Sequence, residues 1–450
     1  MLLVLQDFER RQIVSNPNNG NTSKTIKAKN AKPNFGARGW LLIIAGMLCL
    51  FMAGTGKNDA LNVIIPKFNE IFGWSVTRMS LVGTIGGYIA AVCMFFIATI
   101  IEKVGVKKIV VTCGFLMVIG ICGYNFVNSF TAYVICVMLV LFGEVGLGPF
   151  GVPMLVQNWF PTKKGLAMGW VTVGNNLGSI FINWLLVGSW AAFGLKGGFF
   201  PWAAIGLVGV LLIAFFIKEY PEQHGLRPDN DTSMSREEAD RLLKAGLEYA
   251  KTSPWTMKKL IKTPQTWKIA IGVGFLGMGG IGVITMMVPC FISKGFSDTT
   301  AMFMMSAAAV AAIPCSIGLG VIDSKFGTKK AALAIIVFAF CSLCFMALPV
   351  KWTVWVGAVG GAAMMGCTNN ILASLTSSVF GRYDFQKAFP TLYPVFCIIQ
   401  SSGLAIVGTL SDISGGFTVP YLVLAGANLV GFIIIMSLKD ECIGRTDIAN

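Results

Sequence analysis

The chain has 450 residues, of which 55% are hydrophobic and only 12% are charged. A soluble globular domain carries about 25% charged residues, so the composition excludes a soluble protein and indicates a membrane protein with several spans. The formal net charge of +14 can attract nucleic acid. The basic residues, described below, instead gather on one side of the membrane, which explains the charge by topology.

Twelve apolar stretches follow one another along the chain, each close to the roughly 20 residues that cross a bilayer. Residues 1–38 are polar and lysine-containing, which predicts a disordered cytoplasmic tail. The expected domains are an N-terminal six-helix half at 39–217, a central loop at 218–268, a C-terminal six-helix half at 269–438 and a tail at 439–450. The expected spans lie near 40–65, 78–101, 108–127, 130–157, 165–187, 198–217, 269–291, 300–322, 330–349, 352–376, 389–410 and 420–438. The predicted fold class is an all-α polytopic membrane protein with twelve transmembrane helices in two pseudo-symmetric halves.

The basic residues determine the expected orientation of these spans. Of the 35 Lys and Arg residues, most lie in the two tails, the central loop and the short loops on that same side. Basic residues concentrate on the cytoplasmic side of membrane proteins, so both termini are expected in the cytoplasm of a multi-pass protein of the cell membrane. The loops of the other side carry only Lys67, Arg78, Lys196, Lys294 and Lys351.

A short basic loop occurs twice. Lys103-Val-Gly105-Val-Lys107-Lys108 follows the second span, and Lys325-Phe-Gly327-Thr-Lys329-Lys330 follows the eighth. Two matching six-span halves are typical of transporters built from repeats, in which the substrate site lies near the middle of the membrane between the halves.

The first copy of this loop resembles the signature loop of the major facilitator superfamily, Gly-xxx-Asp-Arg-x-Gly-Arg-Arg, with Ala98 for the first glycine and Glu102 for the aspartate. In the second copy Asp323 stands one place early. Two further motifs, Trp159-Phe160-Pro161-x-Lys163-Lys164-Gly165 and Tyr220-Pro221-Glu222-xx-Gly225, are similar to the oxalate/formate antiporter and monocarboxylate transporter branch. The resemblance, which covers about 40–440, implies a gating role for Glu102, Lys103, Gly105, Lys107, Lys108, Asp323, Lys325 and Gly327.

Glu144 lies near the middle of the fourth span, and Asn176 near the middle of the fifth. An ionised group at that depth costs about 2.5–3.5 kcal/mol on insertion scales, so such groups usually face a wet cavity or a partner. We therefore expect a substrate site between these spans, with Glu144 coupling transport to protons. The alternative is an acid that only hydrogen-bonds neighbouring helices. A stripe at helical spacing supports the cavity, through Thr172, Asn175, Asn176, Ser179 and Asn183.

Lys57 and Asp59 lie in the outer part of the first span. Two residues apart on a helix, they point to different faces, and the sequence leaves open which one faces the cavity. Asp59 is a second candidate for proton coupling, whereas an inward Lys57 is the cation within a span that can bind a carboxylate. The full predicted substrate site consists of Lys57, Asp59, Asn175, Asn176, Asn370, Tyr393 and Gln400.

The interpretation is a secondary active transporter, a symporter or antiporter, that moves a small organic solute by alternating access. The resemblance implies a carboxylate such as a monocarboxylate. Two membrane acids against one lysine leave a zwitterion or cation, such as a betaine, as an alternative, since the spans at 300–322 and 389–410 lack basic residues. A transporter-fold sensor without net transport is the alternative from another class.

No catalytic constellation stands in the sequence, which lacks a Walker loop, an HExxH motif and a GxSxG motif. We therefore expect neither an enzyme nor a cofactor or metal. The 12 cysteines are scattered through apolar runs, where cysteine behaves as a small hydrophobic residue. The expected partners are a small-molecule substrate, the lipid bilayer and protons, without nucleic acid, and the single chain is expected to work as a monomer.

Overall fold

The computed structural model describes residues 35–439 and 443, apart from some side chains within the helices. The chain divides into two compact units, Met1–Gly36 and Ala37–Asn450, and the description below concerns the second. The tail predicted at 1–38 lies outside the described residues except for 35–38, and the tail predicted at 439–450 except for Lys439 and Ile443.

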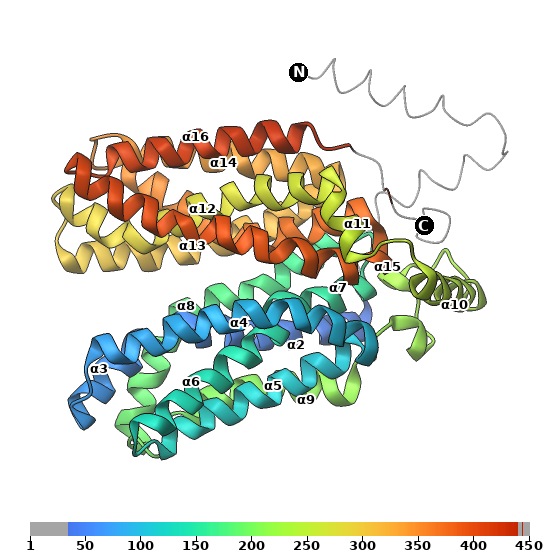
Figure 1. The fold of residues 1–450 in the computed structure, drawn as a ribbon, viewed down its shortest axis with the longest axis horizontal. Helices are drawn as coiled ribbons and strands as arrows, with labels where there is room; N and C mark the ends of the chain where they lie inside the picture. Colours follow the sequence, from blue (N-terminus) through green and yellow to red (C-terminus); the bar gives the residue numbers. More distant parts are fainter. Residues whose placement is uncertain (1–34, 440–442, 444–450) are drawn as a thin grey trace. The chain divides into compact units, whose positions relative to one another are not determined.

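The first half of this unit consists of six membrane-crossing segments (Figure 1). The first is formed by α2 (Gly36–Gly54), the π-helix η2 (Thr55–Asp59) and α3 (Leu61–Phe72). The second and third are α4 (Val76–Val104) and α5 (Val106–Gly123), with the short helix η3 (Tyr124–Phe126) after them. The fourth is formed by α6 (Phe130–Val145), the π-helix η4 (Gly146–Gly151) and α7 (Val152–Trp159). The fifth and sixth are α8 (Lys164–Phe193) and α9 (Phe200–Phe216).

A central segment, residues 218–263, joins this half to the next. It contains η5 (Pro221–His224), η6 (Pro228–Asn230), α10 (Arg236–Thr252) and α11 (Met257–Lys262). The second half consists of α12 (Pro264–Ser293), α13 (Asp298–Phe326), α14 (Thr328–Ala347), α15 (Thr353–Ser414) and α16 (Thr418–Met436). We call the membrane face that carries the central segment the central-segment side.

The described helices account for twelve spans. Nine of these helices, counting α15 once, are long and apolar enough to cross a membrane. Arg78–Met94 and Phe200–Phe216 are two shorter apolar stretches. At about 1.5 Å per residue, the 62 residues of α15 exceed the roughly 30 Å of a hydrocarbon core severalfold. α15 is broken at Gly381, whose φ of 79° and ψ of 173° are not helical, so it contributes two spans.

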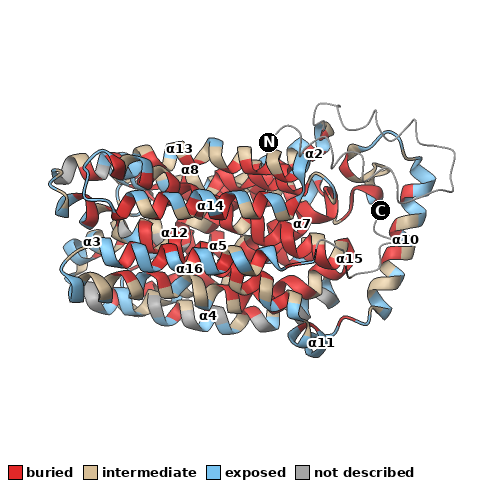
Figure 2. Ribbon diagram, turned by 90° about the horizontal axis from the view of Figure 1, so that it is seen from above, coloured by how far each residue is buried: buried red, intermediate tan, exposed pale blue. Residues whose placement is uncertain are grey.

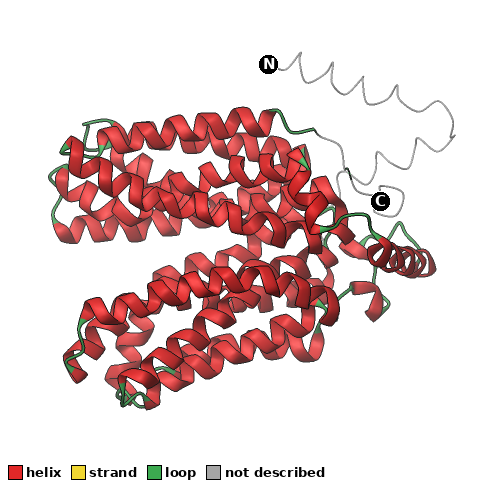
Figure 3. Ribbon diagram, in the orientation of Figure 1, coloured by secondary structure: helices red, strands yellow, loops and turns green. Residues whose placement is uncertain are grey.

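Hydroxyl side chains define where several helices begin. Ser129 accepts a hydrogen bond from the Ala132 N–H, and Ser235 accepts one from the Glu238 N–H at 3.1 Å. Such caps satisfy N–H groups that have no partner within the helix. The Ser235-x-x-Glu238 pattern of the sequence, typical of a helix N-terminus, thus marks the start of α10. Helices are the only regular elements in the described part of the chain (Figure 3).

The two halves approach each other most closely on the central-segment side. The halves meet where α8 packs on α13 and where α15 packs on α4, α7 and α8. α7 is wholly buried, as Figure 2 shows together with the adjoining part of α15. The start of α8 is buried too, whereas Phe181 and Trp184 farther along α8 are 54% and 79% exposed. Burial therefore places the tight contact at one end of the bundle.

Candidate functional site

Two spans widen into π-helix where the sequence places acidic side chains. In the first span η2 contains Lys57 and ends at Asp59, and in the fourth span η4 follows Glu144 closely. η4 contains Pro149, which lacks the backbone N–H that a regular α-helix uses. Turns of π-helix are rare and often lie at functional sites. Both segments are therefore candidate site elements.

Asp59 lies against α8. The Ser179 hydroxyl donates a hydrogen bond to Asp59 Oδ2 at 2.7 Å, which joins the first span to the fifth. Asn175 faces the same neighbour, because a Cβ added at Gly54 would lie 2.7 Å from its Oδ1. These two members of the α8 stripe therefore face the first span. The side chain of Lys57 lies outside the described part of the structure.

Asn176 faces the other half. A Cβ added at Gly366 of α15 would lie 3.4 Å from Asn176 Nδ2 and 2.6 Å from the Ser316 hydroxyl of α13. Ser316 is fully buried, and Asn176 Nδ2 is buried without a hydrogen-bond partner. A buried amide N–H without a partner is costly. A donor therefore stands at the junction of α8, α13 and α15, where a substrate acceptor group can satisfy it.

Glu144 lies at the end of α6, just before η4, and Tyr393 of α15 in the second half packs against η4. The Glu144 carboxyl interacts electrostatically with the Tyr393 hydroxyl, and Glu144 Oε1 lies 3.3 Å from the position of a Cβ added at Gly148. Tyr393 is 8% exposed and packs edge-on against Phe150 of η4, with 5.2 Å between ring centroids. Tyr393, predicted for the site from the second half, thus contacts the π-helical part of the span that carries Glu144.

The remaining predicted substrate residues have partners elsewhere. Asn370 is 1% exposed, and its Nδ2 donates to the Gly165 carbonyl at 3.2 Å, which places it in the closed contact between α8 and α15. Gln400 packs against Gly277 of α12, and its Nε2 lies 3.9 Å from Met365 Sδ. Within the α8 stripe, Ser179 and Asn175 thus face the first span, and Asn176 faces α13 and α15.

The two predicted gating loops have the same backbone. Gly105 has φ 91° and ψ 154°, and Gly327 has φ 91° and ψ 153°, a left-handed conformation that residues with a Cβ rarely adopt. Lys103, Lys108 and Lys325 are exposed and Lys107 is half-buried, while the Glu102 side chain lies outside the described part. The repeat seen in the sequence is therefore a repeat in structure.

Each of these loops is held by an acid. Glu219 accepts a hydrogen bond from the Val106 N–H at 3.0 Å. Burial raises the pKa of Glu219, and this N–H and the nearby Lys108 and Lys107 partly offset the shift. In the second copy Asp323, which is 7% exposed, accepts a hydrogen bond from the Thr328 hydroxyl at 2.6 Å.

A chain of hydroxyl groups connects the second loop to the other half. Lys164 Nζ donates to Ser378 Oγ at 2.8 Å, and Ser378 Oγ donates to Thr328 Oγ1 at 2.8 Å. Thr328 in turn donates to Asp323, so a buried lysine of the first half reaches a buried carboxylate of the second through two hydroxyls. Charges buried away from water need such partners. We call this chain of Lys164, Ser378, Thr328 and Asp323 the hydroxyl bridge.

Glycines allow the helices of this region to touch. A Cβ added at Gly165 would lie 1.7 Å from Asp323 Oδ2, and one at Gly320 would lie 2.5 Å from the Gly165 carbonyl oxygen. One at Gly169 would lie 2.8 Å from the Ser316 carbonyl oxygen. The Gly165-xxx-Gly169 spacing, which permits close helix contact, thus lies where α8 meets α13.

A buried ion pair closes the same side and was not predicted. Arg382 Nη1 donates to Glu222 Oε1 at 2.8 Å, with only 7% and 1% of the two side chains exposed. Arg382 also donates to the Asn158 carbonyl from Nε, at 3.1 Å, and from Nη2. The motif Tyr220-Pro221-Glu222 was the signal in the sequence. The motif did not reveal that Glu222 pairs with Arg382, because Arg382 follows the break in α15, where a loop was expected.

Helix α10 covers this ion pair. The Arg382 guanidinium carbon lies 5.4 Å from the Tyr220 ring centroid and 5.6 Å from that of Tyr383. Leu243 of α10 forms a buried cluster with these two tyrosines. Tyr249 of α10 donates to Asp384 Oδ2 at 2.8 Å. The central segment therefore shields the pair from water. We call Arg382, Glu222 and the Asn158 carbonyl the buried lock.

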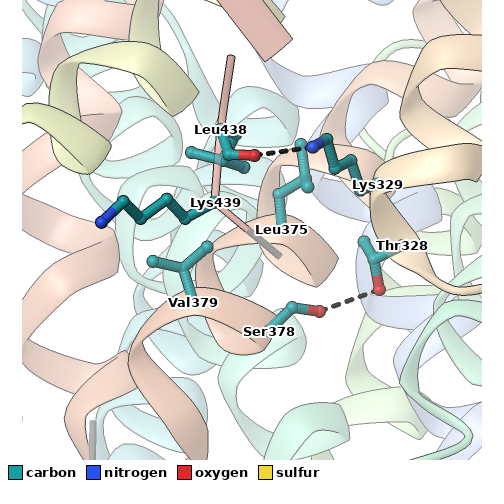
Figure 4. Close-up of a pocket in the computed structure, with 7 residues that line it drawn as sticks. All are labelled: Thr328, Lys329, Leu375, Ser378, Val379, Leu438 and Lys439. Carbon is teal, nitrogen blue, oxygen red and sulfur yellow. Dashed lines mark hydrogen bonds between the residues drawn. The ribbon is translucent and has the colours of Figure 1, made fainter. Parts of the chain in front are cut away.

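A small cavity of about 60 Å³ adjoins the hydroxyl bridge (Figure 4). Lys329 Nζ donates across it to the Leu438 carbonyl at 2.7 Å, and the Ile443 N–H donates to the Val379 carbonyl at 2.8 Å. The chain after α16 thus returns to the end of the first span of α15. The cavity belongs to the second half, and its lining consists of Thr328, Lys329, Leu375, Ser378, Val379, Leu438 and Lys439.

Twelve spans in two halves, with polar groups at their junction, define a repeat-built membrane transporter. The chain matches the Major Facilitator Superfamily over residues 42–389 and belongs to that family. The fold class and the resemblance inferred from the signature loop are therefore confirmed. The protein is a multi-pass secondary transporter that binds a small-molecule substrate in the membrane. Since the family consists of transporters, the expectation that the chain is not an enzyme also holds.

The comparisons include several relatives of low identity. The chain is 21% identical to monocarboxylate transporter 12 of Rattus norvegicus over 442 residues, which is 92% of this chain and 87% of that protein. It is 23% identical to the probable sulfoacetate transporter SauU of Cupriavidus necator, over 85% of this chain and 90% of the other. Among solved structures it resembles the proton:xylose symporter XylE, with a TM-score of 0.71 and 13% identity, over 90% of this chain and 97% of that one.

Proposed function

We propose that the protein moves a small organic carboxylate across the cell membrane by alternating access, in symport with protons or by exchange. The observation that carries the proposal is the contact of the two halves at η4, where Tyr393 of α15 packs on Phe150 with 5.2 Å between ring centroids, six residues beyond Glu144. The halves move relative to each other during transport, so the surroundings of this acid differ between the two states. Its proton affinity then depends on the state, which is what coupling requires.

The substrate class follows from two supports. The named relatives include a monocarboxylate transporter and a probable sulfoacetate transporter, both of which handle small organic anions by name. In this chain, Asn176 Nδ2 is a buried donor without a partner at the junction of the halves, and a carboxylate oxygen is a suitable acceptor for it. Lys57, in the π-helical segment of the first span, is the proposed source of positive charge.

The central-segment side is proposed to be the cytoplasmic side, because it carries most of the basic residues. In this assignment the buried lock and the hydroxyl bridge close the cytoplasmic entrance, and the structure corresponds to the outward-facing state. Both termini then lie in the cytoplasm, and the chain acts as a monomer in the cell membrane.

The coupling role is tested with Glu144→Gln in proteoliposomes. We expect uptake driven by a pH gradient to fall to background, because the amide cannot exchange a proton, whereas exchange of labelled for unlabelled substrate continues. Glu237→Gln, at an exposed position of α10, is the matched control. Unchanged pH-driven uptake by Glu144→Gln contradicts the coupling role.

Variants in the first span distinguish a carboxylate substrate from the alternative, a zwitterion or cation. The observation that favours the alternative is Asp59, a membrane acid that contacts Ser179 of α8. For a carboxylate substrate, Lys57→Ala is expected to reduce transport at least about tenfold, the equivalent of 1.4 kcal/mol, while Asp59→Asn has little effect. Uptake of labelled monocarboxylate and labelled betaine by both variants makes the measurement. The reverse pattern assigns a cationic substrate.

A further inference from the structure

Helix α11 carries apolar and basic side chains outward, side by side. Met257 and Ile261 are 43% and 48% exposed, and they share one face because they are four residues apart. Lys258 and Lys262, also four apart, form the adjoining exposed face. Exposed apolar residues flanked by lysines are typical of helices that lie in the membrane interface.

The position of α11 limits what can cover this surface. α12, a membrane span, begins at Pro264, directly after Lys262 ends α11, so α11 lies where the hydrocarbon region begins. The Trp267 indole, on the first turns of α12, donates to the Ile261 carbonyl at 2.6 Å and is 40% exposed. Tryptophan is enriched at this depth of a bilayer. At this depth of the bilayer, the exposed surface of α11 is expected to contact lipid headgroups rather than another protein.

The chain around α11 is basic, and the acid that approaches it in space, Asp384 of α15, interacts with Lys259 and accepts a hydrogen bond from Ser253. The sequence contains no acidic residue between Glu248 and Asp298, so no carboxylate within this stretch neutralises the lysines. Basic clusters directly beside a membrane span attract anionic lipid headgroups. The ammonium group of Lys259 lies over the Trp255 ring, with 4.7 Å between Nζ and the ring centroid. Lys258 and Lys262 remain as the pair directed toward the headgroups.

The opposite face of α11 packs on α15 near its break at Gly381. Leu260 is fully buried. Trp255, just before α11, meets the Phe380 ring edge-on with 5.4 Å between centroids. Phe380 precedes Gly381, at which α15 breaks, and Arg382 of the buried lock follows. A lipid that holds α11 in place therefore restrains Phe380, through Trp255, next to the break of α15 at Gly381.

We propose that Met257, Lys258, Ile261 and Lys262 form a binding surface for anionic lipid headgroups, and that its occupation stabilises the closed state of the central-segment side through Trp255 and Phe380. The surface lies apart from the substrate site, so the proposal is independent of the substrate class. The lipid class is an anionic glycerophospholipid, for which phosphatidylglycerol is the probe.

The test compares purified protein in nanodiscs of phosphatidylcholine with protein in nanodiscs that also contain phosphatidylglycerol. We expect phosphatidylglycerol to raise the melting temperature and to slow hydrogen exchange in the peptide around Phe380 for the wild type. Lys258→Gln combined with Lys262→Gln is expected to lose both effects. Lys258→Arg with Lys262→Arg keeps the charge and is expected to retain them. The retained response of the arginine pair separates loss of charge from a general loss of folding.

The matched control removes the same charge elsewhere. Lys244 and Lys251 are exposed on α10, away from the start of a span, and their double glutamine variant is expected to respond like the wild type. Equal loss in both glutamine pairs overturns the proposal, since it shows attraction by net charge alone. A response of the wild type to soluble glycerol phosphate as large as to phosphatidylglycerol overturns it too, because the ligand is then a free phosphate and not a membrane surface.

Discussion

Glu222→Gln is expected to open the central-segment side of the transporter, because it leaves the Arg382 guanidinium buried without a counter-charge. Arginine cannot release its proton in a protein, so the lock has no way to relax except by admitting water. Removing one partner of a buried pair costs about 3–5 kcal/mol. A closed state in tenfold excess would become a minor state after a loss of that size.

Hydrogen exchange in nanodiscs measures this change. The peptides that contain Glu222 and Arg382 are expected to exchange faster in Glu222→Gln, while peptides at the far end of α8 are unaffected. The double variant Glu222→Leu, Arg382→Met removes both charges. Because apolar groups of similar size can replace a buried pair at little cost, it is expected to restore slow exchange. Slow exchange in the single variant contradicts the role of the lock.

Gly320→Leu is expected to stop transport by keeping α8 and α13 apart. A Cβ at this position meets the Gly165 carbonyl oxygen at 2.5 Å and Leu166 Cα at 2.8 Å, and backbone atoms cannot move aside as a flexible side chain can. Overpacking of this kind costs about 1–3 kcal/mol, which is a factor of about 5–150 in a two-state equilibrium. Only the state that is closed here bears the cost.

The neighbouring Gly318 provides the control, since a Cβ there has no heavy atom within 4 Å. Gly318→Leu changes the same helix by the same side chain and is expected to transport normally. Flux in proteoliposomes and exchange of the peptide around Gly165 give the two readouts. Normal flux in Gly320→Leu means that this contact is not part of the transport cycle.

The sequence predicted those features that depend on residues near one another in the chain. Hydropathy located the spans, Ser235 and Glu238 located the start of α10, and the matching loops at Gly105 and Gly327 indicated the two halves. Glu144 and Tyr393 were both predicted for the site as polar groups within spans, and the structure packs Tyr393 on η4 of the span that carries Glu144.

The other parts of the site depend on which segments meet, and helical periodicity does not contain that information. Asn175 and Asn176 are neighbours in one stripe, yet one packs on the first span and the other on the second half. Glu222 and Arg382 are far apart in the chain, and each alone looks like a loop residue. The π-helices η2 and η4 were not predicted either, because Gly and Pro in a span permit several kinds of helix distortion.

The covering of the buried lock affects how the transporter responds to its surroundings. Tyr220, Tyr383 and α10 leave Arg382 almost no contact with solvent. Dissolved ions weaken attractions only between groups they can approach. Dissolved salt is therefore expected to have little influence on this ion pair, in contrast to the exposed pair of Lys67 and Glu70.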